Sequence, residues 1–314
     1  MTTQAHTAQR ELGVVAGFDG SPHSEGALRR AAEIAARRDL PLTVVTAYRA
    51  RTQFYATYAA LPAEPEAEVK RRQAEELVHS ASTLLDELPH GPGTLTVVEG
   101  DSVGALAEMS RRAELMVLGS RGVGGFLGRI IGSVADALPA HAHCPTLVVP
   151  SREVPADGPV VVGTDFSPTG RRAVEIAAQE AVERGVPLKI VVALPRPDSG
   201  EYWYPTLSEG AAELIRLRRG ELEQELDEKL VALRESVPGL EVTGEVTVGV
   251  PALVLKQAAR DAQLTVVGSR GRGAVASALL GSVSRAVLHG ADGPVLVVPA
   301  EEAEDTGEEQ AGEA

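Results

Sequence analysis

Short apolar runs alternate with segments of helical periodicity along the chain. Gly13–Phe18 and Leu42–Tyr48 are apolar or β-branched runs of strand length, and Ser24–Arg38 between them carries alanine and leucine at helical spacing. The strands expected in the first half are Gly13–Phe18, Leu42–Tyr48, Leu95–Val98, Leu115–Leu118 and Thr146–Val149. The helices expected between them are Ser24–Arg38, Glu66–Leu88, Val103–Arg112 and Ser133–Ala140. This alternation predicts a parallel sheet with helices on both faces.

The second half of the chain repeats this order. Leu12–Ser21 matches Pro159–Ser167, and the closing run Pro145–Pro150 matches Pro294–Pro299. The corresponding strands are expected near Val160–Thr164, Leu188–Ala193, Glu241–Val248, Leu264–Val267 and Val295–Val298. The corresponding helices are expected near Gly170–Arg184, Leu207–Glu235, Ala252–Asp261 and Ser282–His289. The sequence therefore predicts two tandem, Rossmann-like α/β domains at residues 1–150 and 151–300. Each is a doubly wound five-stranded parallel sheet, and the boundary falls in the polar stretch 151–158.

Each half carries one glycine-rich loop between its fourth strand and the following helix. Gly119–Ser133 reads GSRGVGGFLGRIIGS, and its counterpart Gly268–Ser282 reads GSRGRGAVASALLGS. The positions that recur at identical spacing are Gly119, Gly122, Gly132 and Ser133, and Gly268, Gly271, Gly281 and Ser282. Successive backbone N–H groups and a helix N-terminus form a cradle for an oligophosphate, and a serine there either caps the helix or donates its hydroxyl to a phosphate. The alternative is that the glycines only shape a strand-to-helix turn. The loops are neither a Walker A nor a GxGxxG sequence.

Asp19 and Asp165 end the first strand of each half, beside the expected position of the glycine loop. A carboxylate there accepts a hydrogen bond from a ribose hydroxyl or holds Mg²⁺. The alternative is an aspartate that only forms the turn before Ser-Pro. Arg121 and Arg270 lie inside the loops, where an arginine either clamps a phosphate or is solvated.

Composition and charge narrow the possible partners. The net charge is −14 and basic residues form no stripe, so nucleic acid is an improbable partner. The acid-rich segment 301–314 is expected to be a disordered, solubilising tail, with an interaction role as the alternative. Cys144 is the sole cysteine and is expected to be a buried, inert thiol. There is no secretory signal and no membrane-spanning apolar run, which predicts a cytoplasmic location.

The loops, the first-strand aspartates and the closing LVVP strands together resemble the universal stress protein family over essentially all of both halves. The chain looks like a tandem member of the ATP-binding branch, with an adenine nucleotide alpha hydrolase-like fold. The resemblance implies that backbone around the recurring loop positions, with Val134 and Val283, holds phosphates and ribose. It also implies that Asp19 and Asp165 lie by the adenosine, and that Ala47 and Ala193 contact adenine through their backbone.

The resemblance further implies ATP as the ligand, either alone or with Mg²⁺. The apolar closing strands Thr146–Val149 and Val295–Val298 are expected to pair with each other, because exposed strand edges invite pairing. A further homodimer is also possible.

The function expected is a nucleotide-dependent regulatory module of the stress response with at most slow ATP hydrolysis. A slow ATPase or nucleotidyl-transfer enzyme is the first alternative, and a purely structural interaction protein is the second. His141 and His143 find no further ligands in the sequence, so no metal site is expected.

Overall fold

The computed structural model describes residues 10–49, 66–88, 93–122, 131–150, 157–195, 208–271 and 280–300. The predicted acidic tail at 301–314 and most of the predicted linker lie outside these ranges. None of the described helices combines the length and the apolar content needed to cross a bilayer.

The elements follow the predicted order in both halves. The first half contains β1 (Gly13–Gly17), α1 (Pro22–Arg38), β2 (Leu42–Tyr48), α2 (Glu66–Leu85), β3 (Gly93–Glu99), α3 (Ser102–Met109), β4 (Ala113–Gly119), α4 (Ser133–His141) and β5 (Thr146–Val149). The second half contains β6 (Val160–Gly163), α5 (Pro168–Arg184), β7 (Leu188–Leu194), α6 (Ser208–Ser236), β8 (Val242–Val248), α7 (Pro251–Ala258), β9 (Leu264–Gly268), α8 (Ser282–Gly290) and β10 (Val295–Val298).

Some helix boundaries differ from the predicted ones for local reasons. The helix α1 begins two residues earlier than expected, because Ser21 caps it by accepting a hydrogen bond from the Ser24 N–H and Pro22 fits the first turn. The same Ser-Pro start precedes α5. The predicted helix Val103–Arg112 is divided into α3 and a 3₁₀ turn, Ser110–Arg112.

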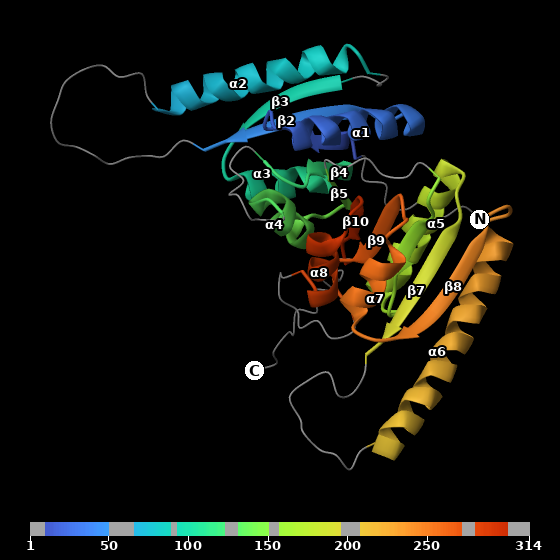
Figure 1. Ribbon diagram of the computed structural model, residues 1–314. Helices are drawn as coiled ribbons and strands as arrows, with labels where there is room; N and C mark the ends of the chain where they lie inside the picture. The colour runs from blue at the N-terminus through green and yellow to red at the C-terminus, as the bar shows by residue number, and fades with distance from the viewer. Residues whose placement is uncertain are drawn as a thin grey trace, which may run out of the picture.

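The strands form one ten-stranded sheet in the order β3-β2-β1-β4-β5-β10-β9-β6-β7-β8. Neighbouring strands within each half are parallel, whereas β5 and β10 pair antiparallel. Figure 1 shows the two halves side by side, with α2 beside β3 and α6 beside β8 at opposite ends of the sheet. The predicted fold class and the predicted pairing of the closing strands are both confirmed.

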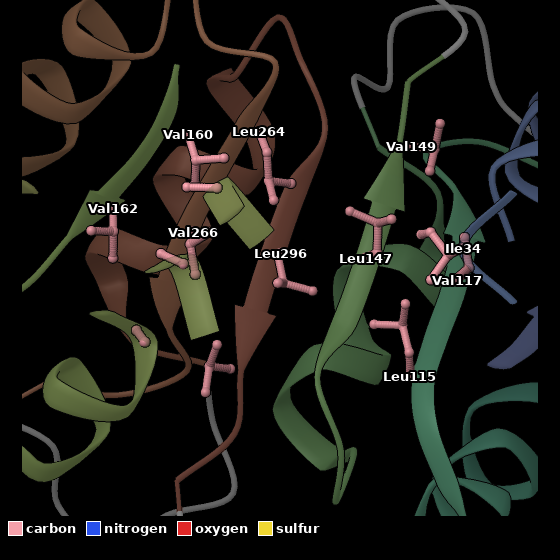
Figure 2. Packing of buried hydrophobic residues seen from close by; sticks show 14 of the residues in the cluster. Ile34, Leu115, Val117, Leu147, Val149, Val160, Val162, Leu264, Val266 and Leu296 are labelled. Carbon is pink, nitrogen blue, oxygen red and sulfur yellow. The ribbon is translucent and has the colours of Figure 1, made fainter. Parts of the chain in front are cut away.

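Helices pack on both faces of this sheet. Buried side chains of α1, α2, α5 and α6 belong to one apolar cluster that is continuous across both halves. Those of α3, α4, α7 and α8 belong to two clusters on the opposite face. Figure 2 shows the continuous cluster near the junction, where Leu147 of β5 and Leu296 of β10 extend from adjoining strands. The two halves therefore share a core as well as a sheet.

Ion pairs connect the halves on each side of the junction. On one face, Arg38 of α1 bonds to Glu180 and Glu183 of α5. On the other face, Asp136 of α4 bonds to Arg285 and His289 of α8. The junction therefore combines backbone pairing, apolar packing and cross-half charge pairs.

Candidate functional site

The glycine loop of the first half leaves the sheet at the carboxyl end of β4. A Cβ on Gly119 would overlap backbone atoms of His23 and Ser24, so only glycine lets β4 pass this close to the start of α1. The loop returns where the Gly132 N–H donates to the Ser120 carbonyl at 2.7 Å. In the second half, the Gly281 N–H donates to the Ser269 carbonyl at 2.8 Å. The ends of both loops are therefore closed by the same hydrogen bond, while their centres, 123–130 and 272–279, lie outside the described residues.

The N-termini of α4 and α8 form one wall of each candidate site. Their N-cap residues are Gly132 and Gly281, and among the described residues no side chain caps either helix. The first-turn N–H groups of a helix have no acceptor within the helix itself, so they are available to an anion. Ser133 and Ser282 are the first helical residues rather than the caps, so of their two predicted roles the capping role is wrong. Val134 and Val283 follow in the same first turns.

The first-strand aspartates lie against the glycine loops of their own halves. Asp19 Oδ1 accepts hydrogen bonds from the Ser21 N–H at 3.1 Å and the Ser21 hydroxyl at 2.6 Å, while Oδ2 occupies the place where a Cβ on Gly122 would stand. Asp165 repeats the arrangement, because its Oδ1 accepts from the Ser167 N–H at 3.0 Å and its Oδ2 would lie 2.6 Å from a Cβ on Gly271. Each carboxylate therefore both forms the predicted turn and contacts the loop.

A cavity of about 330 Å³ lies between these elements in the first half. Its volume is at the lower end of the range of small-molecule sites. Every residue predicted for this half's site lines it, namely Asp19, Ala47, Gly119, Gly122, Gly132, Ser133 and Val134. The cavity lies beyond the carboxyl ends of β1 and β4, between which the strand order reverses, and ligands of doubly wound sheets bind at such a switch point.

Apolar side chains that the sequence did not single out complete this cavity. Val45, Leu106 and Leu118 are among the residues that line it. Burial, followed by the nearby Arg121 charge, lowers the pKa of His23 despite the opposing effect of Asp19, so this histidine is neutral at pH 7. Arg121 also lines the cavity. No group of three His, Cys, Asp or Glu side chains within the described part of the chain is placed to hold a metal.

The second half repeats the geometry in part. Ala193 of β7 corresponds to Ala47 of β2, and both strands keep their place beside the first strand of their half. The Asp165–Gly271 contact and the Ser269–Gly281 hydrogen bond correspond to those of the first half. Gly268 ends β9 against Thr169 of α5, as Gly119 ends β4 against α1.

The fold and the paired glycine loops define a tandem α/β protein whose two halves share one strand order, and comparison with known proteins gives its family. The family model for the universal stress protein family matches residues 13–150 and again 158–299. The chain belongs to the universal stress protein family, as a member with two tandem domains.

Tandem relatives in Mycobacterium tuberculosis are similar over almost the whole chain. Universal stress protein Rv2623 is 36% identical over 297 residues, covering 91% of this chain and 96% of the relative. Universal stress protein Rv1996 is 37% identical over 305 residues, covering 92% and 95%. A universal stress protein crystal structure from Archaeoglobus fulgidus has the same fold, with a TM-score of 0.63 at 21% identity over 92% of this chain and 98% of that one.

Proposed function

We propose that the chain binds ATP in the first-half cavity and at the equivalent place in the second half, and that the bound nucleotide sets the state of a regulatory protein of the stress response. One observation carries the proposal: a cavity at the sheet's switch point is lined by every first-half residue that the sequence predicts to contact nucleotide. The family membership supports the stress-response role.

The chemistry of the cavity walls suits the three parts of ATP. The N-terminus of α4, which no described side chain caps, offers its first-turn N–H groups as donors to the triphosphate. The carboxylate of Asp19 is an acceptor for ribose hydroxyls. The apolar side chains of Val45, Leu106 and Leu118 suit the adenine ring, next to the Ala47 backbone. Mg²⁺ is expected to accompany the triphosphate, because magnesium commonly binds through substrate phosphates.

The proposed module holds ATP and turns it over slowly. Among the described residues that line the cavity, Asp19 is the only carboxylate, and it already accepts two hydrogen bonds from Ser21. A turnover rate far below 1 s⁻¹ is expected, against about 10 s⁻¹ for a median enzyme. A rate in the ordinary enzyme range would instead establish the slow-ATPase or nucleotidyl-transfer alternative. A regulatory ATP-binding role also fits the cytoplasmic location and the further homodimer, both of which stay predictions.

The decisive experiment measures nucleotide per chain. The purified protein is denatured and the released nucleotide is quantified by chromatography, with two per chain expected when both sites are filled. Nucleotide-free protein that shows no thermal shift with Mg·ATP would contradict the proposal and favour a purely structural interaction protein.

Matched glycine variants assign the site. Gly122→Ala places a methyl group on the Asp19 carboxylate and is expected to lower first-site ATP content at least tenfold. Gly26→Ala is the control, because a Cβ at this position in α1 meets no atom within 4 Å. Gly271→Ala tests the second site, with Gly220→Ala of α6 as its control for the same reason. Full ATP content in both loop variants would refute the loop mechanism.

A further inference from the structure

A carboxylate from one half and two cationic or titratable groups from the other meet between α4 and α8. Asp136 Oδ2 accepts from Arg285 Nη2 at 2.6 Å, and its Oδ1 lies 3.2 Å from Arg285 Nε. His289 Nε2 lies 2.8 Å from the same Oδ1. The arginine therefore binds the carboxylate bidentately, which is the strongest geometry available to this pair.

Asp136 lies in the first turn of α4, directly after Ser133, Val134 and Ala135, which line the cavity. It follows Ser133 by three residues, which places its Cα about 4.5 Å further along the helix axis. Its N–H donates to the carbonyl of the N-cap Gly132. A negative charge in a first turn stabilises the helix, but the same charge repels an anionic ligand at that N-terminus. The site therefore places a fixed anion within one turn of the position proposed for the triphosphate.

Arg285 occupies the corresponding place in the other half. It is the fourth residue of α8, as Asp136 is the fourth residue of α4, so equivalent positions carry opposite charges and pair across the junction. Burial tends to raise the pKa of Asp136, but hydrogen bonds from Arg285 and His289 outweigh it and lower that pKa. Asp136 is thus ionised at neutral pH, and its charge is compensated from the second half of the chain.

We propose that Arg285, contributed by the second half, is a positioning residue for the first-half site: by neutralising Asp136 it raises that site's affinity for the triphosphate of ATP. Since the site itself is proposed, this inference rests on the proposed function. It also makes each half an electrostatic regulator of the other, because Asp136 in turn reduces the cationic charge that Arg285 presents at the N-terminus of α8.

The Asp136–Arg285 ion pair also has a purely structural interpretation. Under that interpretation, substitutions of either residue change ATP binding in the same direction. Asp136→Asn and Arg285→Gln both break the same pair. If the pair only holds α4 against α8, both substitutions weaken ATP binding by similar factors. If the pair controls charge at the site, Arg285→Gln leaves the Asp136 charge with only its His289 contact and weakens binding, whereas Asp136→Asn removes the charge and tightens binding. The two interpretations therefore differ in the sign of one variant.

The test is titration calorimetry of the full chain, freed of nucleotide, with Mg·ATP at low and high salt. Arg285→Gln is expected to weaken binding roughly three- to tenfold and Asp136→Asn to tighten it by a similar or smaller factor. The double variant is expected to lie between the two single variants. All the differences should shrink in 0.5 M salt, because partly exposed charges are screened. Arg30→Gln, which breaks a surface pair with Glu33 within α1, is the control and should match the wild type.

The outcomes separate this inference from the proposed function. Wild-type protein that binds no Mg·ATP refutes the proposed function. Wild-type protein that binds Mg·ATP, while both single variants weaken binding equally or leave it within twofold, overturns the role of Arg285 and leaves the proposed function standing. A salt-insensitive difference between the variants would also overturn it.

Discussion

Glu180 of α5 is the most deeply buried member of the charge network that connects the two halves. Its side chain is 4% exposed, and that of Arg184, one helical turn later, is 6% exposed. Glu180 Oε2 accepts from Arg184 Nε at 3.0 Å and Nη2 at 2.8 Å, and Oε1 accepts from Arg38 of the first half. Replacing this carboxylate by the isosteric amide therefore leaves one arginine buried without its counter-charge.

Glu180→Gln is expected to lower the free energy of unfolding by about 3–5 kcal/mol, the usual cost of removing one partner from a buried ion pair. The matched control is Glu183→Gln, three residues further along α5. Its side chain is 31% exposed and pairs with Arg38 at 2.9 Å and Arg37 at 3.4 Å, so the expected cost is at most about 1 kcal/mol. Urea unfolding followed by circular dichroism at pH 7 measures both. Costs that agree within about 1 kcal/mol would refute the assignment of Glu180 as the buried centre of the network.

The buried Glu180 carboxylate should also make the free energy of unfolding fall at acidic pH. Burial tends to raise the pKa of Glu180, but the charges of Arg38 and Arg184 outweigh it, so the folded-state pKa lies below the ordinary value of 4.5. A lowered carboxyl pKa contributes stability that is complete above the unfolded-state pKa and is lost as the pH falls through the folded-state pKa. Unfolding midpoints between pH 7 and pH 3 should therefore fall less steeply in Glu180→Gln than in the wild type. Parallel profiles would contradict this pKa assignment.

Two further predictions concern buried side chains near the junction. Thr146→Val should stabilise the protein by about 1 kcal/mol in the same urea assay, because the Thr146 hydroxyl is buried in β5 and has no hydrogen-bond partner among the described residues; a loss of stability would reveal a partner for this hydroxyl. Burial raises the pKa of the Cys144 thiol to about 12, so a thiol-specific chromogenic reagent at pH 8 should label native protein no faster than the protein unfolds, and rapid labelling of folded protein would contradict the burial of this residue.

The repeat in the sequence was sufficient to predict the fold. The same order and spacing of elements in the two halves predicts the same doubly wound fold twice, and the apolar closing strands Thr146–Val149 and Val295–Val298 predict their own pairing, which the sheet order confirms. The strands can be recognised in the sequence because a parallel sheet is buried on both faces, so each strand is a nearly continuous apolar run. The start of α1 at Pro22 was missed because propensity alone does not reveal which serine caps a helix.

The site was predicted as a set of positions rather than as a geometry. The motifs identify Asp19 and Gly122 as site residues. Whether the two residues touch depends on the paths of the segments that follow β1 and β4, which the sequence does not reveal. The roles of Asp136 and Arg285 were not predicted, since pairing across the junction depends on the antiparallel register of β5 and β10. One signal for them was present: equivalent positions of the two halves carry opposite charges. Whether nucleotide binds at the predicted residues stays a prediction.

The antiparallel junction between β5 and β10 has a consequence for how the halves recognise each other. An isologous dimer of identical copies brings each residue near the two-fold axis against its own counterpart. A dimer made of first halves alone would place Asp136 against a second Asp136, and a dimer of second halves would place Arg285 against Arg285. The pair that forms in this chain therefore favours unlike halves over like ones. Joining the halves in one polypeptide permitted this divergence, because a covalently held partner is always the complementary one.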